Sequence, residues 1–164
     1  MSQETTPIHQ KIDGAREYEA ALNTLLEQAQ HNVRIFDFNL ADGGYNSPRR
    51  FELVQRFLLA SPANRLKIVL HETDYLLRFC PRMMMLIKQF GHAIELNQTD
   101  SDARRLYDPF ATADRDCHVH RFHYEDSRAV LALRDIPGTE MLNRRFEEIW
   151  EASFPVAANT VLGL

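Results

Sequence analysis

Apolar residues recur at helical spacing in two long segments of the chain, one near each end. The segment over 14–30 carries them on one helical face, and Asp13 is its expected N-cap. The segment over 137–152 has a stripe that is expected to face the core. The two apolar sets are Tyr18, Leu22, Leu25, Leu26 and Ala29, and then Met141, Leu142, Phe146, Ile149 and Trp150.

Two further helices are predicted in the middle of the chain from their cap and breaker residues. The serine and proline at 47–48 form a cap and first-turn pair, so a helix is expected over 49–60. Thr73 is the expected N-cap of a helical region over 74–90, which Pro81 should break.

Short runs rich in β-branched and aromatic residues alternate with these helices, and turn signals such as "ADGGYNSP" bound them. Three runs fall between the helices, and three follow a polar link. The pattern predicts strands over 33–40, 65–71, 92–98, 110–114, 117–124 and 127–135.

This order predicts an α/β fold with one mixed sheet, parallel in its first part and antiparallel in its later strands, flanked by helices. A chain of 164 residues is within the usual size of one domain, so a single domain over 1–164 is expected. Residues 1–10 are expected to be flexible. The apolar tail over 153–164 either packs on its own core or a neighbouring subunit, or stays flexible.

The composition favours a globular protein, with 45% hydrophobic and 26% charged residues. No run of about 18 apolar residues spans a bilayer, and the start "MSQETTPIHQK" lacks the layout of a signal peptide. A cytoplasmic protein is therefore expected. Cys80 and Cys117 are too few for a disulfide framework and are expected to be free thiols.

The charge of the chain bears on its partners. A net charge of −4 argues against a generic nucleic-acid coat, so nucleic acid is not the favoured partner. Only three of the 19 basic residues are lysine, and the arginines include adjacent pairs at 49–50, 104–105 and 144–145. The planar guanidinium suits phosphates and carboxylates, but the pairs also fit ordinary surface salt bridges.

Polar residues gather where the first three predicted strands end, which is where ligands usually bind in such sheets. Asp42, Thr73 and Asp100 can alternatively serve only as caps of turns and helices. Asp37 lies among apolar neighbours, where an unpaired charge is costly, so His71 or an arginine is expected to pair with it. The strand-end residues are Asp37, Asn39, Asp42, His71, Glu72, Asn97, Gln98 and Thr99.

The segment "CHVHRFHY" concentrates histidines in one predicted strand. Period-two alternation puts His118 and His120 on one face, with Cys117 on the other. His118 and His120 can hold a zinc ion if His71, Asp37 or Asp114 supplies a third ligand. Alternatively they are polar strand residues with structural hydrogen bonds, or part of a pH-responsive interface.

The order of elements, with "YDPFATAD" before a strand pair and a closing "FEEIWEAS", resembles one half of a phospholipase D-like fold. The signature H-x-K-x-x-x-x-D of that family supplies a histidine nucleophile, a lysine for the phosphate and an orienting aspartate. Laid on this sequence, it puts Tyr107, Pro109 and Asp114 at those positions. A second register, on "HVHRFHYE", puts His118, His120 and Glu125 there.

The chain is also similar to a bacterial domain family that carries "YNS", "RLKIVLH", "CPR", "HRFHY" and "FEEIWEAS", a likeness that brings no activity with it. The first register of the phospholipase D signature implies the fold without its chemistry, because proline cannot donate a hydrogen bond or carry charge and a phenol is a poor nucleophile at neutral pH.

Two functions are therefore expected. The first is a non-catalytic module, with no cofactor, that binds a protein partner or an anionic ligand at the strand-end mouth, using Arg104, Arg105 and Tyr107. The resemblance implies a homodimer for it. The alternative is a divergent phosphoester hydrolase in which His118, His120 and either Asp114 or His71 form an acid–base or metal site.

Overall fold

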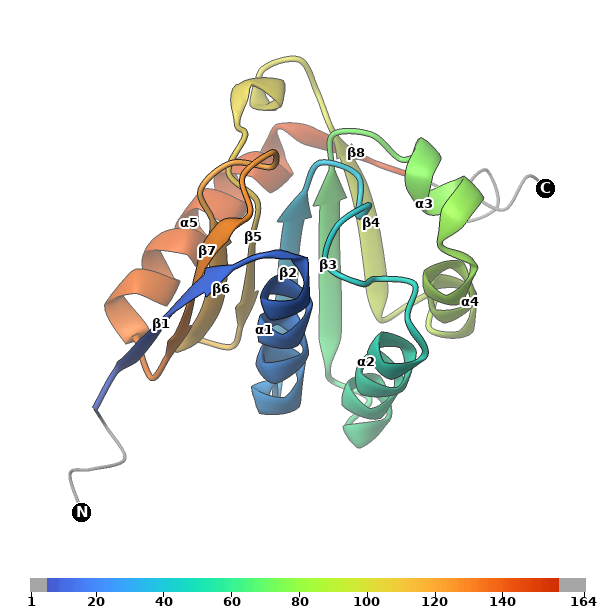
Figure 1. The fold of residues 1–164 in the computed structure, drawn as a ribbon. Coiled ribbons are helices and arrows are strands. Elements are labelled where there is room, and N and C mark those ends of the chain that lie inside the picture. Colours follow the sequence, from blue (N-terminus) through green and yellow to red (C-terminus); the bar gives the residue numbers. More distant parts are fainter. Residues whose placement is uncertain (1–5, 157–164) are drawn as a thin grey trace.

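The computed structural model describes residues 6–156 and contains a single mixed sheet of eight strands in the order β1-β7-β6-β5-β2-β3-β4-β8 (Figure 1). The strands are β1 (Ile8–Asp13), β2 (Asn32–Asp37), β3 (Arg65–Leu70), β4 (Ile94–Thr99), β5 (Phe110–Ala113), β6 (Cys117–Arg121), β7 (Arg128–Leu133) and β8 (Ser153–Pro155). The helices are α1 (Ala15–Gln28), α2 (Pro48–Ala60), α3 (Asp74–Phe79), α4 (Pro81–Gln89) and α5 (Ile136–Glu151).

The predicted mixture of parallel and antiparallel pairing is confirmed. Strands β2, β3 and β4 pair in parallel, and helices form the crossover connections between them. Strand β5 then pairs antiparallel with β2, and β6, β7 and β1 extend the sheet in the same antiparallel manner. The carboxyl ends of the parallel strands therefore lie together at one edge, where the start of β5 also lies.

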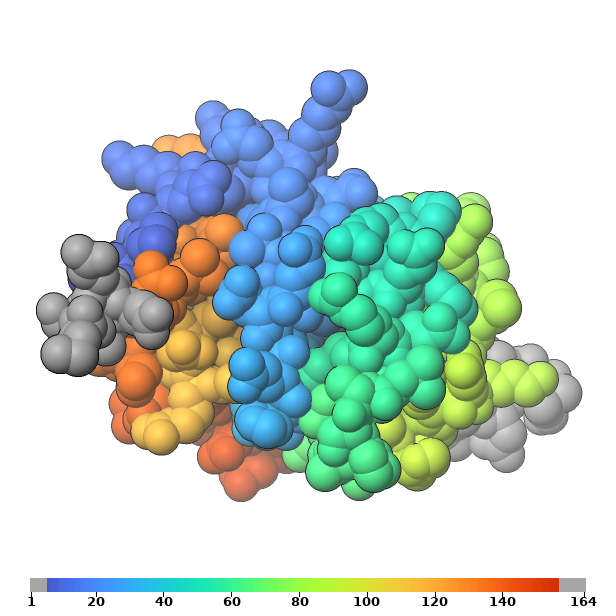
Figure 2. Space-filling view, turned by 90° about the horizontal axis from the view of Figure 1, so that it is seen from below, coloured from blue at the N-terminus to red at the C-terminus, as the bar shows by residue number. Residues whose placement is uncertain are grey.

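The helices cover both faces of the sheet, as expected. Helices α1, α2 and α4 lie side by side on one face, and Figure 2 shows their chain segments in blue, teal and yellow-green without a gap between them. Helix α5 covers the other face. Each face has its own apolar core. Leu66, Ile68 and Leu70 of β3 face the three-helix side, and Val69 faces α5.

Both ends of the sheet are strands that the sequence pattern did not predict. Residues 8–10, expected to be flexible, belong to β1, which pairs with β7 along its whole length. Residues 153–155, expected to be a tail, form β8 and pair with β4. Hydrogen bonds to a neighbouring strand order both segments, although each buries little apolar surface. Residues 1–5 and 157–164 lie outside the described residues.

One of the three predicted helix caps is wrong. Asp13 ends β1 instead of capping α1, whose N-cap is Gly14 without a side-chain hydrogen bond. Thr73 is the N-cap of α3, as expected, although its side chain makes no capping hydrogen bond. Ser47 does cap α2, by accepting from the Arg50 N–H at 3.0 Å. The break at Pro81 is confirmed, because that residue begins α4.

Two strands end three residues earlier than the apolar pattern predicted, and one predicted core residue of α5 is exposed. Strand β2 ends at Asp37 and β6 ends at Arg121, because the chain turns there into loops. In α5, Leu142, Phe146 and Ile149 are buried and Trp150 is half-buried. Met141 is exposed, since it lies on the flank of the stripe.

Candidate functional site

His71 lies at the edge where the parallel strands end, directly after β3, and both nitrogens of its ring have partners. Nε2 lies 2.7 Å from the carbonyl oxygen of Leu106, and Nδ1 lies 2.7 Å from Oγ1 of Thr99. A carbonyl only accepts, so Nε2 carries the proton and Nδ1 accepts from the threonine hydroxyl. Burial lowers the pKa of His71, which favours this neutral form.

The loop before β5 brings Arg104 and Tyr107 to the same edge. The Leu106 carbonyl that binds His71 fixes this loop. Arg104 is exposed, and its charge adds to the effect of burial in lowering the pKa of His71. Tyr107 is 48% exposed. Arg105 is also exposed, in the same 3₁₀ turn as Arg104.

Four rings form an aromatic cluster at this edge: Phe38, Tyr107, His123 and Tyr124. The rings of Phe38 and Tyr124 stack at 4.7 Å between centroids, and those of His123 and Tyr124 also stack at 4.7 Å. Tyr107 lies 5.6 Å from His123 and 6.0 Å from Tyr124. The backbone N–H of Tyr124 donates to the carbonyl of Tyr107, which ties the two loops together. The cluster gives this edge partly exposed aromatic rings.

Asp37 ends β2 at this edge, but its side chain lies on the other face of the sheet from His71. Its carboxylate accepts a hydrogen bond from the Leu40 N–H at 2.8 Å and is 5% exposed. Burial raises the pKa of Asp37 to about 6, although the N–H groups of Leu40 and Phe38 and the charge of Arg121 oppose this shift. Of the two predicted partners, His71 is wrong, because adjacent positions along paired strands face opposite sides of the sheet. The other, an arginine, corresponds to Arg121, whose charge acts on Asp37 without forming an ion pair with it.

Asn39 does not present its amide to the edge. Its Oδ1 accepts from the Ala41 N–H at 2.9 Å, so the side chain closes a turn in the loop after β2. In this structure Asn39, a predicted strand-end site residue, therefore has a local structural contact.

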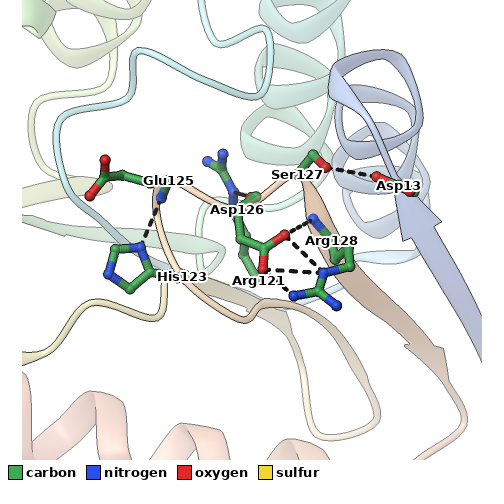
Figure 3. Close-up of polar contacts among 7 residues, drawn as sticks. All are labelled: Asp13, Arg121, His123, Glu125, Asp126, Ser127 and Arg128. Carbon is green, nitrogen blue, oxygen red and sulfur yellow. Dashed lines mark hydrogen bonds and ion pairs between the residues drawn. The ribbon is translucent and has the colours of Figure 1, made fainter.

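Arg121 lies on the same face of the sheet as Asp37, and no sequence pattern indicates a role for it. Its Nε donates to the carbonyl of Asp126 at 2.6 Å (Figure 3). Its Nη1 donates to Oδ2 of Asp42 at 2.9 Å. The guanidinium also lies over the Tyr18 ring, 5.0 Å from its centroid. No local signal identifies this residue, since Asp42 and Tyr18 reach it from distant parts of the chain.

His118 and His120 share the sheet face toward α5, as alternation predicted, but they bind different partners. Nδ1 of His118 lies 2.8 Å from Oγ1 of Thr139, and burial lowers the pKa of His118 to about 4. Nε2 of His120 donates to Oδ2 of Asp108 at 2.8 Å. Among residues 6–156, no group of three or more histidine, cysteine, aspartate or glutamate residues is placed to hold a metal ion.

Asp108 is a further residue of this region to which no sequence pattern assigns a role. Arg145 of α5 binds it through both carboxylate oxygens, at 2.7 and 2.9 Å. Burial opposes ionisation of Asp108, but the hydrogen bonds from His120 and Arg145 outweigh it and hold the pKa well below its usual range. This cluster joins the start of β5 to α5.

Asp114 lies at the opposite end of β5 from Tyr107. Its carboxylate accepts hydrogen bonds from the backbone N–H groups of Gln30, His31 and Asn32, at 2.8–2.9 Å. The structure therefore does not bring Asp114 together with His71. Since the carboxylate is occupied by the connection between α1 and β2, its role here is structural.

Comparison with solved structures identifies the class of fold. Nuc from Salmonella typhimurium, a phospholipase D family member, shares 14% identity at a TM-score of 0.67, over 92% of this chain and 99% of that chain. NucT from Helicobacter pylori shares 11% at a TM-score of 0.61, over 92% and 100%. The archaeal chromatin protein TrmBL2 shares 18% at a TM-score of 0.65, over 90% of this chain, which spans about half (54%) of its length.

The chain thus has a phospholipase D-like fold, in agreement with the resemblance seen in its sequence. It belongs to the family described as Domain of unknown function (DUF7931), whose profile matches residues 14–159. No curated protein matches the sequence. Within the described part of the chain, every helix is too short or too polar to cross a membrane.

Proposed function

We propose that this chain is a non-hydrolytic phospholipase D-like module that binds an anionic, phosphate-containing ligand. The ligand site is the edge formed by Arg104, His71 and the aromatic cluster. The observation that carries the proposal is the state of His71, the imidazole at this edge. Both of its nitrogens are hydrogen-bonded within the fold, so neither is free to attack phosphorus.

The residues at the signature positions support the same proposal. In the first register, Tyr107 stands at the nucleophile position and Pro109 at the lysine position. Pro109 is buried and has no donor for a phosphate oxygen. Asp114, at the third position, is held by three backbone N–H groups.

Arg104 supplies the attractive contact for an anion. Its guanidinium is exposed and makes no ion pair within residues 6–156, so its donors are available to phosphate oxygens. The adjacent aromatic cluster offers a ring face for an apolar part of the same ligand.

The test uses phenyl phosphate as the probe, measured by calorimetry on the whole chain, with phenol and inorganic phosphate as half-ligands. We expect phenyl phosphate to bind most tightly and Arg104→Ala to weaken it about tenfold, as for loss of one charged hydrogen bond. Arg56→Ala is the matched control, because Arg56 is an exposed arginine of α2. Equal weakening by both variants, or no binding of phenyl phosphate, would contradict the proposal.

A divergent phosphoester hydrolase is the second candidate, and one contact favours it. His120 and Asp108 form a pair whose side chains are 28% and 25% exposed, with Nε2 2.8 Å from Oδ2. This is the arrangement in which a carboxylate orients an imidazole. Turnover of bis(4-nitrophenyl) phosphate that disappears in His120→Ala would establish hydrolysis. Absence of turnover in the wild-type chain would leave the binding module.

We also propose that two copies pair across this edge of the sheet. Exposed apolar side chains there support it, because Tyr107 is 48% and Phe122 is 54% exposed. A dimer measured by light scattering, and converted to monomer by Phe122→Asp, is the expected result. A monomer at all concentrations would contradict it.

A further inference from the structure

A cavity of about 320 Å³ lies on the three-helix face, beside the start of α1. Its wall includes Ala15, Tyr18, Glu19, Asp42, Arg121 and Glu125. None of the aromatic cluster residues lines it, and its charges differ from those of the proposed phosphate site. Its volume is within the range of small-molecule sites.

One side of the cavity offers donors for an anionic group. The N-cap of α1, Gly14, has no capping side chain. The N–H groups of Ala15, Arg16 and Glu17 have no acceptor among residues 6–156, and Ala15 lines the cavity. The start of a helix favours negative charge because these amides and the helix dipole act together.

Arg121 provides an independent donor in the same wall. Its Nε and Nη1 are bound by Asp126 and Asp42, whereas Nη2 has no hydrogen-bond partner among residues 6–156. The residue is only 8% exposed, so packing and these two bonds hold the guanidinium in place. A fixed guanidinium with one free nitrogen is suited to a carboxylate oxygen.

Carboxylates on another part of the cavity wall favour a positively charged group. Glu19 makes no ion pair within the described part of the chain, and Glu125 and Asp42 also line the cavity. The Glu19 carboxylate lies over Gly44, where a Cβ would overlap it. Three carboxylates against one guanidinium disfavour a simple anion. A ligand that also carries a positive group satisfies both sides.

We propose that this cavity binds a small zwitterion with the chemistry of a free α-amino acid. Its carboxylate accepts from the α1 amides and Nη2 of Arg121, and its ammonium group lies against Glu19. A simple amine leaves the amides without an acceptor, and a simple carboxylate leaves Glu19 without a cation. Both half-ligands therefore bind more weakly than the zwitterion.

L-alanine is the probe, with propionate and ethylamine as half-ligands, and binding is followed by amide chemical shifts of the whole chain. We expect L-alanine to move the resonances of residues 15–17 and 43–44 and to bind about tenfold more tightly than either half-ligand. Binding of propionate or ethylamine as tight as that of L-alanine would overturn the proposal, as would no shift with L-alanine.

Two variants test the two halves without disturbing the fold. Glu19→Gln keeps the shape of the side chain and removes its charge. Ala15→Pro removes one free amide at the first helical position, where proline is well tolerated. Each is expected to weaken L-alanine several-fold, whereas Glu151→Gln, an exposed residue at the end of α5, is the control. Unchanged binding in both test variants would show that L-alanine binds elsewhere. Phenyl phosphate binding is expected to be unaffected in all three.

Discussion

Asp37 and His71 follow neighbouring positions of two paired strands, yet they belong to different environments. Asp37 is paired with Leu70, so both face the helices α1, α2 and α4, and His71 faces α5. The sequence correctly indicated that a carboxylate among apolar residues needs compensation. It could not identify the Leu40 N–H as the partner, because that contact depends on how the loop after β2 turns.

Asp37→Asn is expected to stabilise the protein by about 2 kcal/mol at pH 7, since the neutral amide avoids a buried charge and its oxygen still accepts from Leu40. The ordinary pKa of Asp37 is 3.8, and the folded value is about 6. Between these values the folded state holds a proton that the unfolded state has lost, so stability falls as the pH rises through about 6.

Urea unfolding of both proteins at pH 4 to 8 measures this effect. The difference between the variant and the wild type isolates Asp37 from His71 and His118, whose lowered pKa values act with the opposite sign. A difference in stability that does not change with pH would show that Asp37 is ionised throughout.

At the level of elements, local patterns predicted most of the sheet and little of the site. The alternation in β6 correctly placed His118 and His120 on one face. The pattern could not show that Thr139 and Asp108 bind them separately, because α5 and the loop before β5 approach only in the folded chain. Arg121 illustrates the same limit, since its partner Asp42 lies 79 positions away in the sequence.

The turn after β5 depends on Asp114, which has a positive φ of 57° and binds the connection between α1 and β2. We expect Asp114→Ala to lower the free energy of unfolding by about 2–3 kcal/mol, because three hydrogen bonds are lost and alanine is strained at this φ. Thermal unfolding is the measurement.

Two further substitutions separate the loss of the hydrogen bonds from the backbone strain and from the loss of a charge. Asp114→Gly removes the same bonds without the backbone strain, so it should cost less than alanine. Asp116→Ala, two positions along, is the control for loss of a nearby carboxylate. Wild-type stability in Asp114→Ala would show that these contacts contribute nothing to the fold.

For the molecule as a whole, the least predictable parts of the fold are β1 and β8, the two border strands of the sheet. Strand β1 buries only Ile12, and β8 has three residues, so neither shows the apolar run by which strands are recognised. The central strands β2 and β3 do show it, because helices cover both of their faces.

A chain beginning at Gly14 is expected to be about 3 kcal/mol less stable than the full chain, since it loses the pairing of β1 with β7 and the burial of Ile12. It should also aggregate more readily, because β7 becomes an unprotected edge. Urea unfolding and light scattering measure both effects. A chain beginning at Ile8 keeps β1 and is the control. Equal stability of the two would show that β1 is dispensable.

Strands β1 and β8 are the two border strands of the eight-stranded sheet, so a distance measured between them reports whether both are in place. Ile8 of β1 and Phe154 of β8 are both exposed, and seven strand spacings, about 34 Å across the sheet, separate their strands. A donor and an acceptor fluorophore attached at these two sites would report, by energy transfer, when either border strand detaches. Fraying could then be followed separately from collapse of the interior.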